Sequence, residues 1–216
     1  MKTIFDKFDK RAIPNLPLVA FEGRIEVISG MGEADRAVDF LLKQPILGLD
    51  TETKPSFHRG DGHKVALLQV CSHDICFLFR LNHIDMPDSI VRLLSDTCVK
   101  KIGLSWSDDL CVLRRRREFT PGAFEDIQRI VGTYGIEDMS LQKLYANLFG
   151  QRISKSQRLS NWEADVLTEK QKLYAATDAW ACIKLYEELQ RMRTEGYKLV
   201  HTHAETPEEG AIPDNQ

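Results

Sequence analysis

Hydrophobic positions change their spacing about halfway along the chain, from a pattern typical of strands to one typical of helices. The first half contains apolar or alternating runs that are too short for helices: Arg24–Ile28, Ile46–Thr51, Val65–Cys71, Ile75–Phe79 and Val99–Leu104. One helix is expected among them, over residues 33–43, because Ala37 and Leu41 recur at helical spacing. The polar segment Ser72–Asp74 separates two of the runs, which predicts a β-hairpin.

The second half is predicted to be helical. Ser107–Arg117 and Ser140–Phe149 have helical spacing, and Gly150 follows the second as its expected C-cap. The longest helix is predicted over Thr168–Met192, with Thr168 at the N-cap of a capping box. A mixed sheet followed by helices that pack on it predicts a single α/β domain.

Composition and chain ends add limits to this picture. We expect residues 1–20 to be a loosely attached polar extension, residues 21–200 the folded domain, and residues 201–216 a disordered acidic tail. An apolar share of 43% in 216 residues is enough for a sizeable core. The formal net charge of −3 gives no overall attraction to nucleic acid, so a polyanion would need a local basic patch and metal ions.

The cysteines and the apolar runs indicate the cellular compartment in which the protein is expected. Five cysteines, an odd number, form no Cys-x-x-Cys pair and most have apolar neighbours, so we expect buried thiols in a reducing compartment: Cys71, Cys76, Cys98, Cys111 and Cys182. The N-terminus has no apolar signal region, and no run approaches the roughly 20 apolar residues of a membrane span. The expectation is a soluble, cytoplasmic protein without membrane contacts.

Two acidic residues lie on a predicted strand. Asp50 and Glu52 are two positions apart, so their side chains project from the same face. A buried strand carries two carboxylates only with partners, because burying unpaired charge is strongly unfavourable. The alternative is an ordinary strand end at which water solvates both acids, since Asp-x-Glu is a common pattern.

A second pair lies on the long predicted helix. Tyr174 and Asp178 are four positions apart and share one face. The stripe through Leu173 and Trp180 is expected to place this helix in the core, and small residues would let it approach the sheet closely: Ala175, Ala176 and Ala179. The alternative is an exposed helix face on which the Tyr and the Asp are incidental.

A third acidic residue, Asp109, follows the predicted strand that ends near Gly103. Ser107 or Asp108 is the expected cap of the next helix, which leaves Asp109 near the positive helix N-terminus. If these acids meet, their like charges require metal ions. Oxygen ligands favour Mg²⁺ or Mn²⁺, and two such ions about 3.5–4 Å apart are the usual means of cutting phosphodiesters.

Together the three motifs resemble the tyrosine-bearing subgroup of the DEDD family of 3′→5′ exonucleases, over Ile46–Leu189. The matching motifs are Asp50–Glu52, Gly103–Asp109 and Tyr174–Asp178, and the spacing from Gly103 favours Asp109 over Asp108. The resemblance implies a ribonuclease H-like fold that binds two divalent ions, Mg²⁺ or Mn²⁺.

In that family pattern Asp50 would bridge both ions, Glu52 and Asp178 would complete one shell, and Asp109 would serve the second. Tyr174 would orient the attacking water. Nucleic acid would be the substrate, DNA favoured over RNA, and nucleoside 5′-monophosphates the products.

Substrate contacts are less well defined by the sequence. The candidates are Thr51, Phe57, Gln69, Trp106 and Arg114. Phe57 and Gln69 could stack on or bond to the terminal nucleotide, or could equally be loop packing and a core-edge amide. Arg114 opens an arginine run that either contacts phosphates or forms a solvated helix end.

Two other functions fit the same residues. One is a ribonuclease D-like exonuclease that processes RNA 3′ ends. The other is a nucleic-acid-binding module that has lost catalysis, against which the presence of all five motif residues argues.

Overall fold

The computed structural model describes residues 1–56 and 62–202. Its centre is a six-stranded mixed sheet in the order β3-β6-β5-β4-β7-β8. The strands are β3 (Arg24–Ile28), β4 (Ile46–Thr53), β5 (Val65–Cys71), β6 (Ile75–Arg80), β7 (Lys100–Gly103) and β8 (Phe124–Asp126). β5 runs antiparallel to both of its neighbours, and the other pairs are parallel. The predicted strands and the hairpin are therefore confirmed, while β8 was not predicted.

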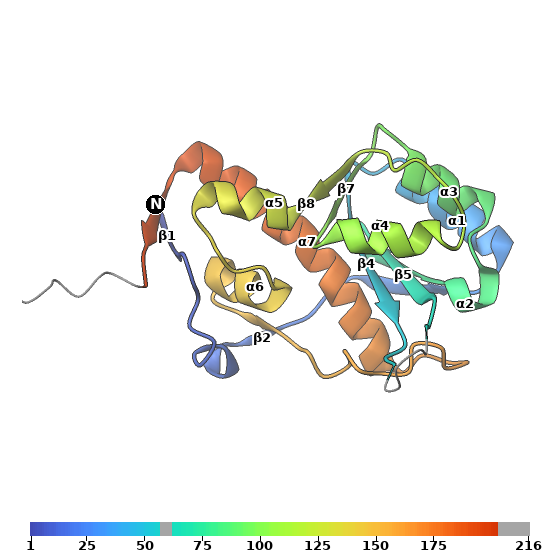
Figure 1. Ribbon diagram of the computed structural model, residues 1–216, viewed down its shortest axis with the longest axis horizontal. Coiled ribbons are helices and arrows are strands. Elements are labelled where there is room, and N and C mark those ends of the chain that lie inside the picture. The colour runs from blue at the N-terminus through green and yellow to red at the C-terminus, as the bar shows by residue number, and fades with distance from the viewer. Residues whose placement is uncertain (57–61, 203–216) are drawn as a thin grey trace, which may run out of the picture.

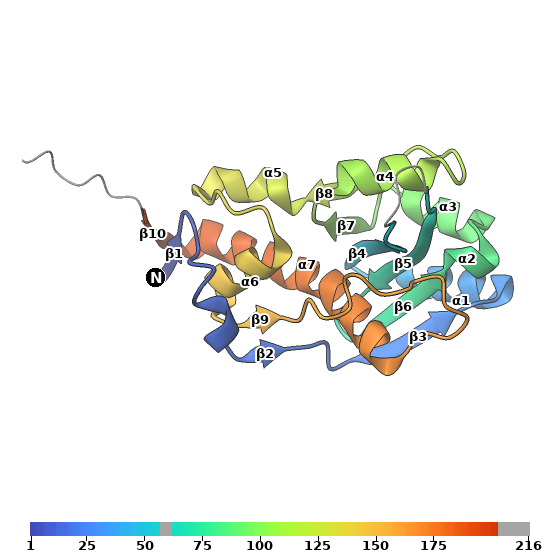
Figure 2. The same ribbon diagram turned by 60° about the horizontal axis from the view of Figure 1, so that its bottom comes forward.

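Helices cover both faces of this sheet (Figures 1 and 2). One face packs against α1 (Met31–Leu41), α3 (Asp88–Ser95) and α4 (Trp106–Arg114), with the short α2 (Leu81–Ile84) at its border. The other face packs against α7 (Glu169–Glu195). Near the C-terminal half of α7 lie α5 (Ile127–Val131), the 3₁₀ turn η2 (Gly132–Tyr134) and α6 (Leu141–Phe149).

The longest helix, α7, begins as its sequence predicts. The Thr168 hydroxyl accepts the Gln171 N–H at 3.2 Å, and the Gln171 side chain accepts the Thr168 N–H at 3.0 Å, which completes the capping box. Leu173, expected on the buried stripe, is instead 40% exposed, because the adjacent stripe through Tyr174 and Asp178 faces the sheet. In the described part of the chain no helix has both the length and the apolar character needed to cross a bilayer.

The first residues are part of the fold, contrary to the expected loose attachment. β1 (Lys2–Phe5) pairs in parallel with β10 (Tyr197–Val200), and Ile4 between them is fully buried. The 3₁₀ turn η1 (Ile13–Asn15) follows, and β2 (Leu18–Val19) pairs with β9 (Arg152–Ile153). Residues 203–216 of the predicted tail lie outside the described residues.

The cysteine prediction is wrong for one pair. Ser72 N–H donates to the Ile75 carbonyl at the hairpin turn, so Cys71 lies directly opposite Cys76, and a disulfide joins them. Cys182 is a buried thiol as expected, whereas Cys98 and Cys111 are exposed.

Candidate active site

The site forms where α7 crosses β4. A side chain at Gly48 would bring its Cβ to 2.0 Å from the Ala179 carbonyl oxygen, so only glycine permits this backbone approach. Ala175, Ala176 and Ala179 are fully buried at the crossing, as the small residues predicted. Because strand side chains alternate, Asp50 and then Glu52 follow Gly48 on the face that meets α7.

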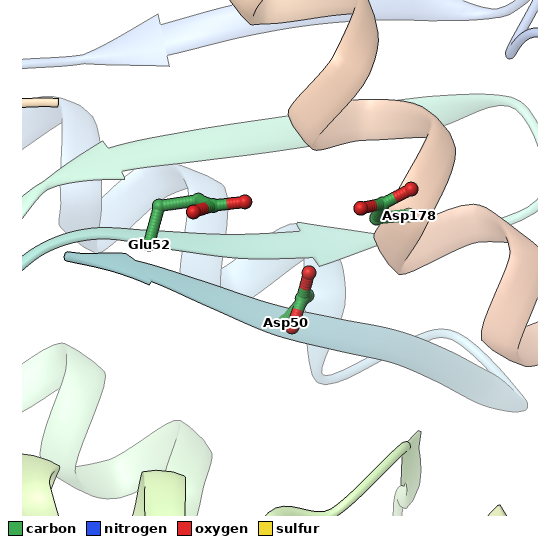
Figure 3. Close-up of side chains that lie close together, drawn as sticks. All are labelled: Asp50, Glu52 and Asp178. Atoms are coloured by element: carbon green, nitrogen blue, oxygen red, sulfur yellow. The ribbon is translucent and has the colours of Figure 1, made fainter. Parts of the chain in front are cut away.

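Three carboxylates meet at this crossing. Asp50 and Glu52 come from β4, Asp178 comes from the third turn of α7, and their side chains point toward one another (Figure 3). One oxygen of each lies within 4.8 Å of one oxygen of the other two. The structure thus brings together three of the four acids predicted from the sequence.

Burial makes this cluster costly in its charged form. Burial, with the charges of Asp178 and Asp109, raises the pKa of Asp50 well above its usual range. Burial and the neighbouring carboxylates raise the pKa of Glu52 to about 10. Burial also raises the pKa of Asp178 to about 7, although the Tyr174 hydroxyl and the charge of Lys155 oppose the shift. Such a cluster needs cations to stay ionised at neutral pH.

The donor set fits a divalent metal ion. All three side chains offer hard carboxylate oxygens, the ligands that Mg²⁺ and Mn²⁺ prefer. Asp178 is only 8% exposed, and within the described residues its Oδ1 is buried without a hydrogen-bond partner. A buried carboxylate oxygen that lacks a donor is an unfavourable arrangement unless a cation binds it.

The fourth acid, Asp109, lies apart from this cluster. Its carboxylate accepts a hydrogen bond from the Thr51 hydroxyl, whose side chain alternates with those of Asp50 and Glu52 along β4. Burial raises the pKa of Asp109 to about 6, and the charge of Asp108 adds to the shift. Asp108 itself is exposed, so the structure favours Asp109, as the motif spacing did.

Tyr174 lies one helical turn before Asp178. Its side chain is 8% exposed, and its ring lies 6.0 Å from the Trp162 ring between centroids. Burial, followed by the charges of Asp178 and Glu52, raises the pKa of Tyr174 well above its usual range. The hydroxyl therefore stays protonated at neutral pH and acts as a neutral hydrogen-bonding group.

The predicted substrate contacts have different outcomes. Gln69 is fully buried opposite Asp50, and Trp106 is 3% exposed against Phe124, so neither presents a surface to a substrate. Their burial argues against both predictions, since the sequence could not show that both side chains point into packed layers. Thr51 donates its hydroxyl to Asp109.

The remaining two candidates do not gain support. Arg114 lies at the last turn of α4, where its guanidinium bonds the Phe119 carbonyl and pairs with Glu118. Arg116 and Arg117 bond carbonyls and aspartates of the fold, so the arginine run is structural at these positions. Phe57 lies outside the described residues.

Two cations of the polar loop ahead of the third motif lie beside the cluster. The exposed Lys155 and Arg158 are close enough for their charges to lower the pKa of Asp178 and of Glu52, respectively, against the larger effect of burial. Both belong to the loop that connects β9 to α7. The sequence indicates a polar loop that could close over substrate at Ser154–Arg158, but only the fold shows that its two cations lie near the acids.

Comparison with known proteins decides the family. A family model described as 3′-5′ exonuclease matches residues 25–193, most of the chain. The chain belongs to the 3′-5′ exonuclease family. Within the family it is 30% identical over 192 residues to a 3′-5′ exonuclease of Arabidopsis thaliana, a match that covers 82% of this chain and 67% of the relative.

Another relative is the bifunctional 3′-5′ exonuclease/ATP-dependent helicase WRN of Mus musculus. The identity is 31% over 185 residues, which covers 81% of this chain but only 13% of the relative. The chain therefore corresponds to a small part of that protein's length.

Solved structures share the fold. The EXO domain of Aedes aegypti Nibbler superposes with a TM-score of 0.73 at 18% identity, covering 85% of this chain and 94% of that domain. Escherichia coli RNase D superposes with a TM-score of 0.69 at 22% identity, covering 80% of this chain and 47% of that one. The ribonuclease H-like α/β fold expected from the motifs is thus confirmed.

Proposed function

We propose that the chain is a divalent-metal-dependent exonuclease of the tyrosine-bearing DEDD subgroup, which removes nucleoside 5′-monophosphates from the 3′ end of a nucleic acid. The observation that carries the proposal is the buried cluster of Asp50, Glu52 and Asp178, with oxygens within 4.8 Å of one another. Membership of the 3′-5′ exonuclease family supports the reaction and its polarity.

The proposed site holds two ions, Mg²⁺ or Mn²⁺. Asp50, Glu52 and Asp178 would hold one, and Asp50 with Asp109 would hold the other. When bound, such ions lower the pKa of water and stabilise charge on a phosphate. Neutralising the cluster is itself favourable, because burial holds the carboxyl pKa values of Asp50, Glu52 and Asp178 above their ordinary range.

The chain's own side chains then have separate tasks. Tyr174 keeps its proton, so it orients the nucleophile by hydrogen bonding and does not take the proton from it. The charges of Lys155 and Arg158 lower the pKa of Asp178 and of Glu52, respectively, and these two cations would contact the phosphate of a bound substrate. Thr51 lies between Asp50 and Glu52 along β4 and donates its hydroxyl to Asp109, which keeps Thr51 as a proposed substrate contact.

We propose DNA as the favoured substrate. The identity of 31% with the mouse relative exceeds the identity of 22% with RNase D, whose structure is described as that of an exoribonuclease involved in structured RNA processing. The second candidate is an RNA 3′-end exonuclease of the RNase D type, and a silent binding module is the third. We also propose residues 21–200 as the catalytic domain.

The test is a substrate panel with labelled single- and double-stranded DNA and RNA, in the presence of Mg²⁺ or Mn²⁺. Wild type should shorten at least one substrate from its 3′ end, and a 3′ block should prevent it. Asp50→Ala should remove the activity. Asp39→Ala is the matched control, because Asp39 is an exposed aspartate that pairs with Arg92 on the far side of α1.

The outcomes separate the alternatives. A wild-type protein that shortens none of the substrates contradicts the enzymatic function and favours a binding module. Digestion of RNA alone selects the RNase D-like candidate. If Asp50→Ala digests as fast as wild type, the site assignment is wrong.

A further inference from the structure

The helix that carries Asp109 begins in an unusual way. Ser105 precedes α4 with φ 63° and ψ 36°, a left-handed conformation that is unfavourable for residues other than glycine. No side chain of its own caps α4. The caps expected from the sequence, Ser107 and Asp108, lie instead within the first turn and are exposed.

A residue from the neighbouring strand supplies the missing acceptors. Asp126 ends β8, in register with Gly103 at the end of β7. Its Oδ1 accepts the N–H of Ser105 at 2.9 Å, and its Oδ2 accepts the N–H of Trp106 at 2.9 Å. Oδ1 also accepts the Gln128 N–H at 2.9 Å and so caps α5. One carboxylate therefore fixes the left-handed turn and the starts of two helices.

The orientation of α4 is fixed on its other side by packing. A Cβ at Gly103 would lie 1.4 Å from Trp106 Nε1, so the indole rests directly on the glycine. The same ring contacts Phe124 of β8 at 5.2 Å between centroids. With Trp106 held beneath the helix and Asp126 bonded to its first amides, Asp109 is directed to Thr51 on β4.

The carboxylate at this position has an electrostatic cost. Its negative charge is one of the groups that raise the pKa of Asp109, after burial and Asp108. A capping residue without charge would avoid that repulsion, but a serine or threonine hydroxyl could not accept from three amides on two helices with the same geometry. The double acceptor is thus the feature that the turn requires.

We propose that Asp126 is a positioning residue for Asp109: by bonding the amides of Ser105 and Trp106 it sets the turn that aims Asp109 at the metal site. The inference rests on the proposed function, because it assigns Asp109 to a bound cation. Asp126 itself contacts neither the ions nor the substrate.

The experiment measures Mn²⁺ binding by calorimetry and the Mn²⁺ concentration for half-maximal exonuclease activity. Asp126→Ala should weaken Mn²⁺ binding by about tenfold, as losses of groups that orient metal ligands do. Asp126→Asn keeps one acceptor oxygen and should weaken it by about threefold. The matched control is Asp96→Ala, because Asp96 accepts the amides of Cys98 and Val99 at the opposite end of β7.

A double-mutant cycle separates positioning from general destabilisation. In an Asp109→Ala background, Asp126→Ala should cause no further loss of Mn²⁺ affinity, because its effect passes through Asp109. Asp96→Ala should leave the Mn²⁺ isotherm unchanged in both backgrounds, even where it lowers the melting temperature.

Two results would overturn the inference: an unchanged isotherm in folded Asp126→Ala, or an undiminished effect in the Asp109→Ala background. If Asp126→Ala does not fold, Asp126→Asn decides, and wild-type Mn²⁺ affinity in that variant contradicts the proposal. A wild type that binds Mn²⁺ but cuts no substrate contradicts the proposed function alone. The role of Asp126 is still tested in that case, because the Mn²⁺ isotherms of its variants can be compared with that of wild type.

Discussion

The two sides of β4 hold their acidic residues in different ways. On the side of α7, Asp50, Glu52 and Asp178 meet because the helix backbone almost touches Gly48. On the side of α4, Asp109 reaches Thr51 from a helix whose start is bonded to Asp126. The first arrangement depends on close backbone packing, which is stiff. The second depends on a few hydrogen bonds at a turn, so it is the more easily altered part of the site.

The largest expected effect is a difference in exonuclease activity between variants of the acids on the α7 side and on the α4 side of β4. Asp178→Asn removes a ligand from the three-acid cluster and should lower kcat/KM by about 10³-fold, which corresponds to about 4 kcal/mol of transition-state stabilisation. Asp109→Asn should cost less, about 10- to 100-fold, since Asp109 lies outside that cluster. Steady-state kinetics on the preferred substrate checks both. Equal losses would contradict the division of the site into two unlike halves.

The next effect concerns the crossing itself. Gly48→Ala should lower the free energy of unfolding by about 3 kcal/mol, because its Cβ would meet the Ala179 carbonyl oxygen at 2.0 Å. Urea unfolding measures the loss. Gly32→Ala is the control: in α1 its Cβ meets only the Arg36 guanidinium at 3.6 Å, and alanine favours helix, so stability should stay equal or rise. A Gly48→Ala protein as stable as wild type would show that the backbone approach is not tight.

A third prediction uses pH to test the charge of the cluster. The pKa values of Asp178, about 7, and Asp109, about 6, are raised, so the metal-free fold holds protons that the unfolded chain releases. The stability that these bound protons give to the metal-free fold is fully present below about pH 4 and is lost as pH rises through 6 to 7. Divalent ions replace those protons, so Mg²⁺ should raise the melting temperature by several degrees at pH 8 and by little at pH 5.

Thermal scans with and without Mg²⁺ measure this difference. In Asp178→Asn, the metal-free protein should lose less stability between pH 5 and pH 8, because one raised carboxyl group is absent. A Mg²⁺ effect that is the same at both pH values would contradict the link between protons and metal.

The smallest expected effect concerns the two cations beside the cluster. Lys155→Ala or Arg158→Ala should raise KM by about fivefold with little change in the Mn²⁺ requirement, because each is proposed to contact the substrate phosphate and not the ions. Added salt should reduce the difference between variant and wild type. Lys43→Ala, which removes an exposed lysine after α1, should leave KM unchanged. A loss confined to the Mn²⁺ requirement would instead place these cations in metal binding.

Local patterns were sufficient for much of the fold. The capping box at Thr168 and the hairpin around Ser72–Asp74 could be read directly, because each involves residues a few positions apart. The pairing of β1 with β10 could not, since it joins segments almost two hundred positions apart and neither strand has a distinctive pattern. The Cys71–Cys76 disulfide was missed because it depends on which residues close the hairpin.

The sequence by itself determined the chemistry of the site. Alternation places Asp50 and Glu52 on one face of a strand, and helical spacing places Tyr174 and Asp178 on one face of a helix, whatever the rest of the fold does. The motifs built from these residues also determined the family, which the comparisons confirmed.

The tertiary structure alone decided which of these groups meet. It separated Asp109 from the three-acid cluster, buried Gln69 and Trp106, and brought Lys155 and Arg158 to the acids. It also assigned to Asp126 the task of starting α4. The physical reason is that periodicity fixes only the direction of a side chain on its own element. Distances between elements depend on strand register and on how closely backbones pack, and both are properties of the whole fold.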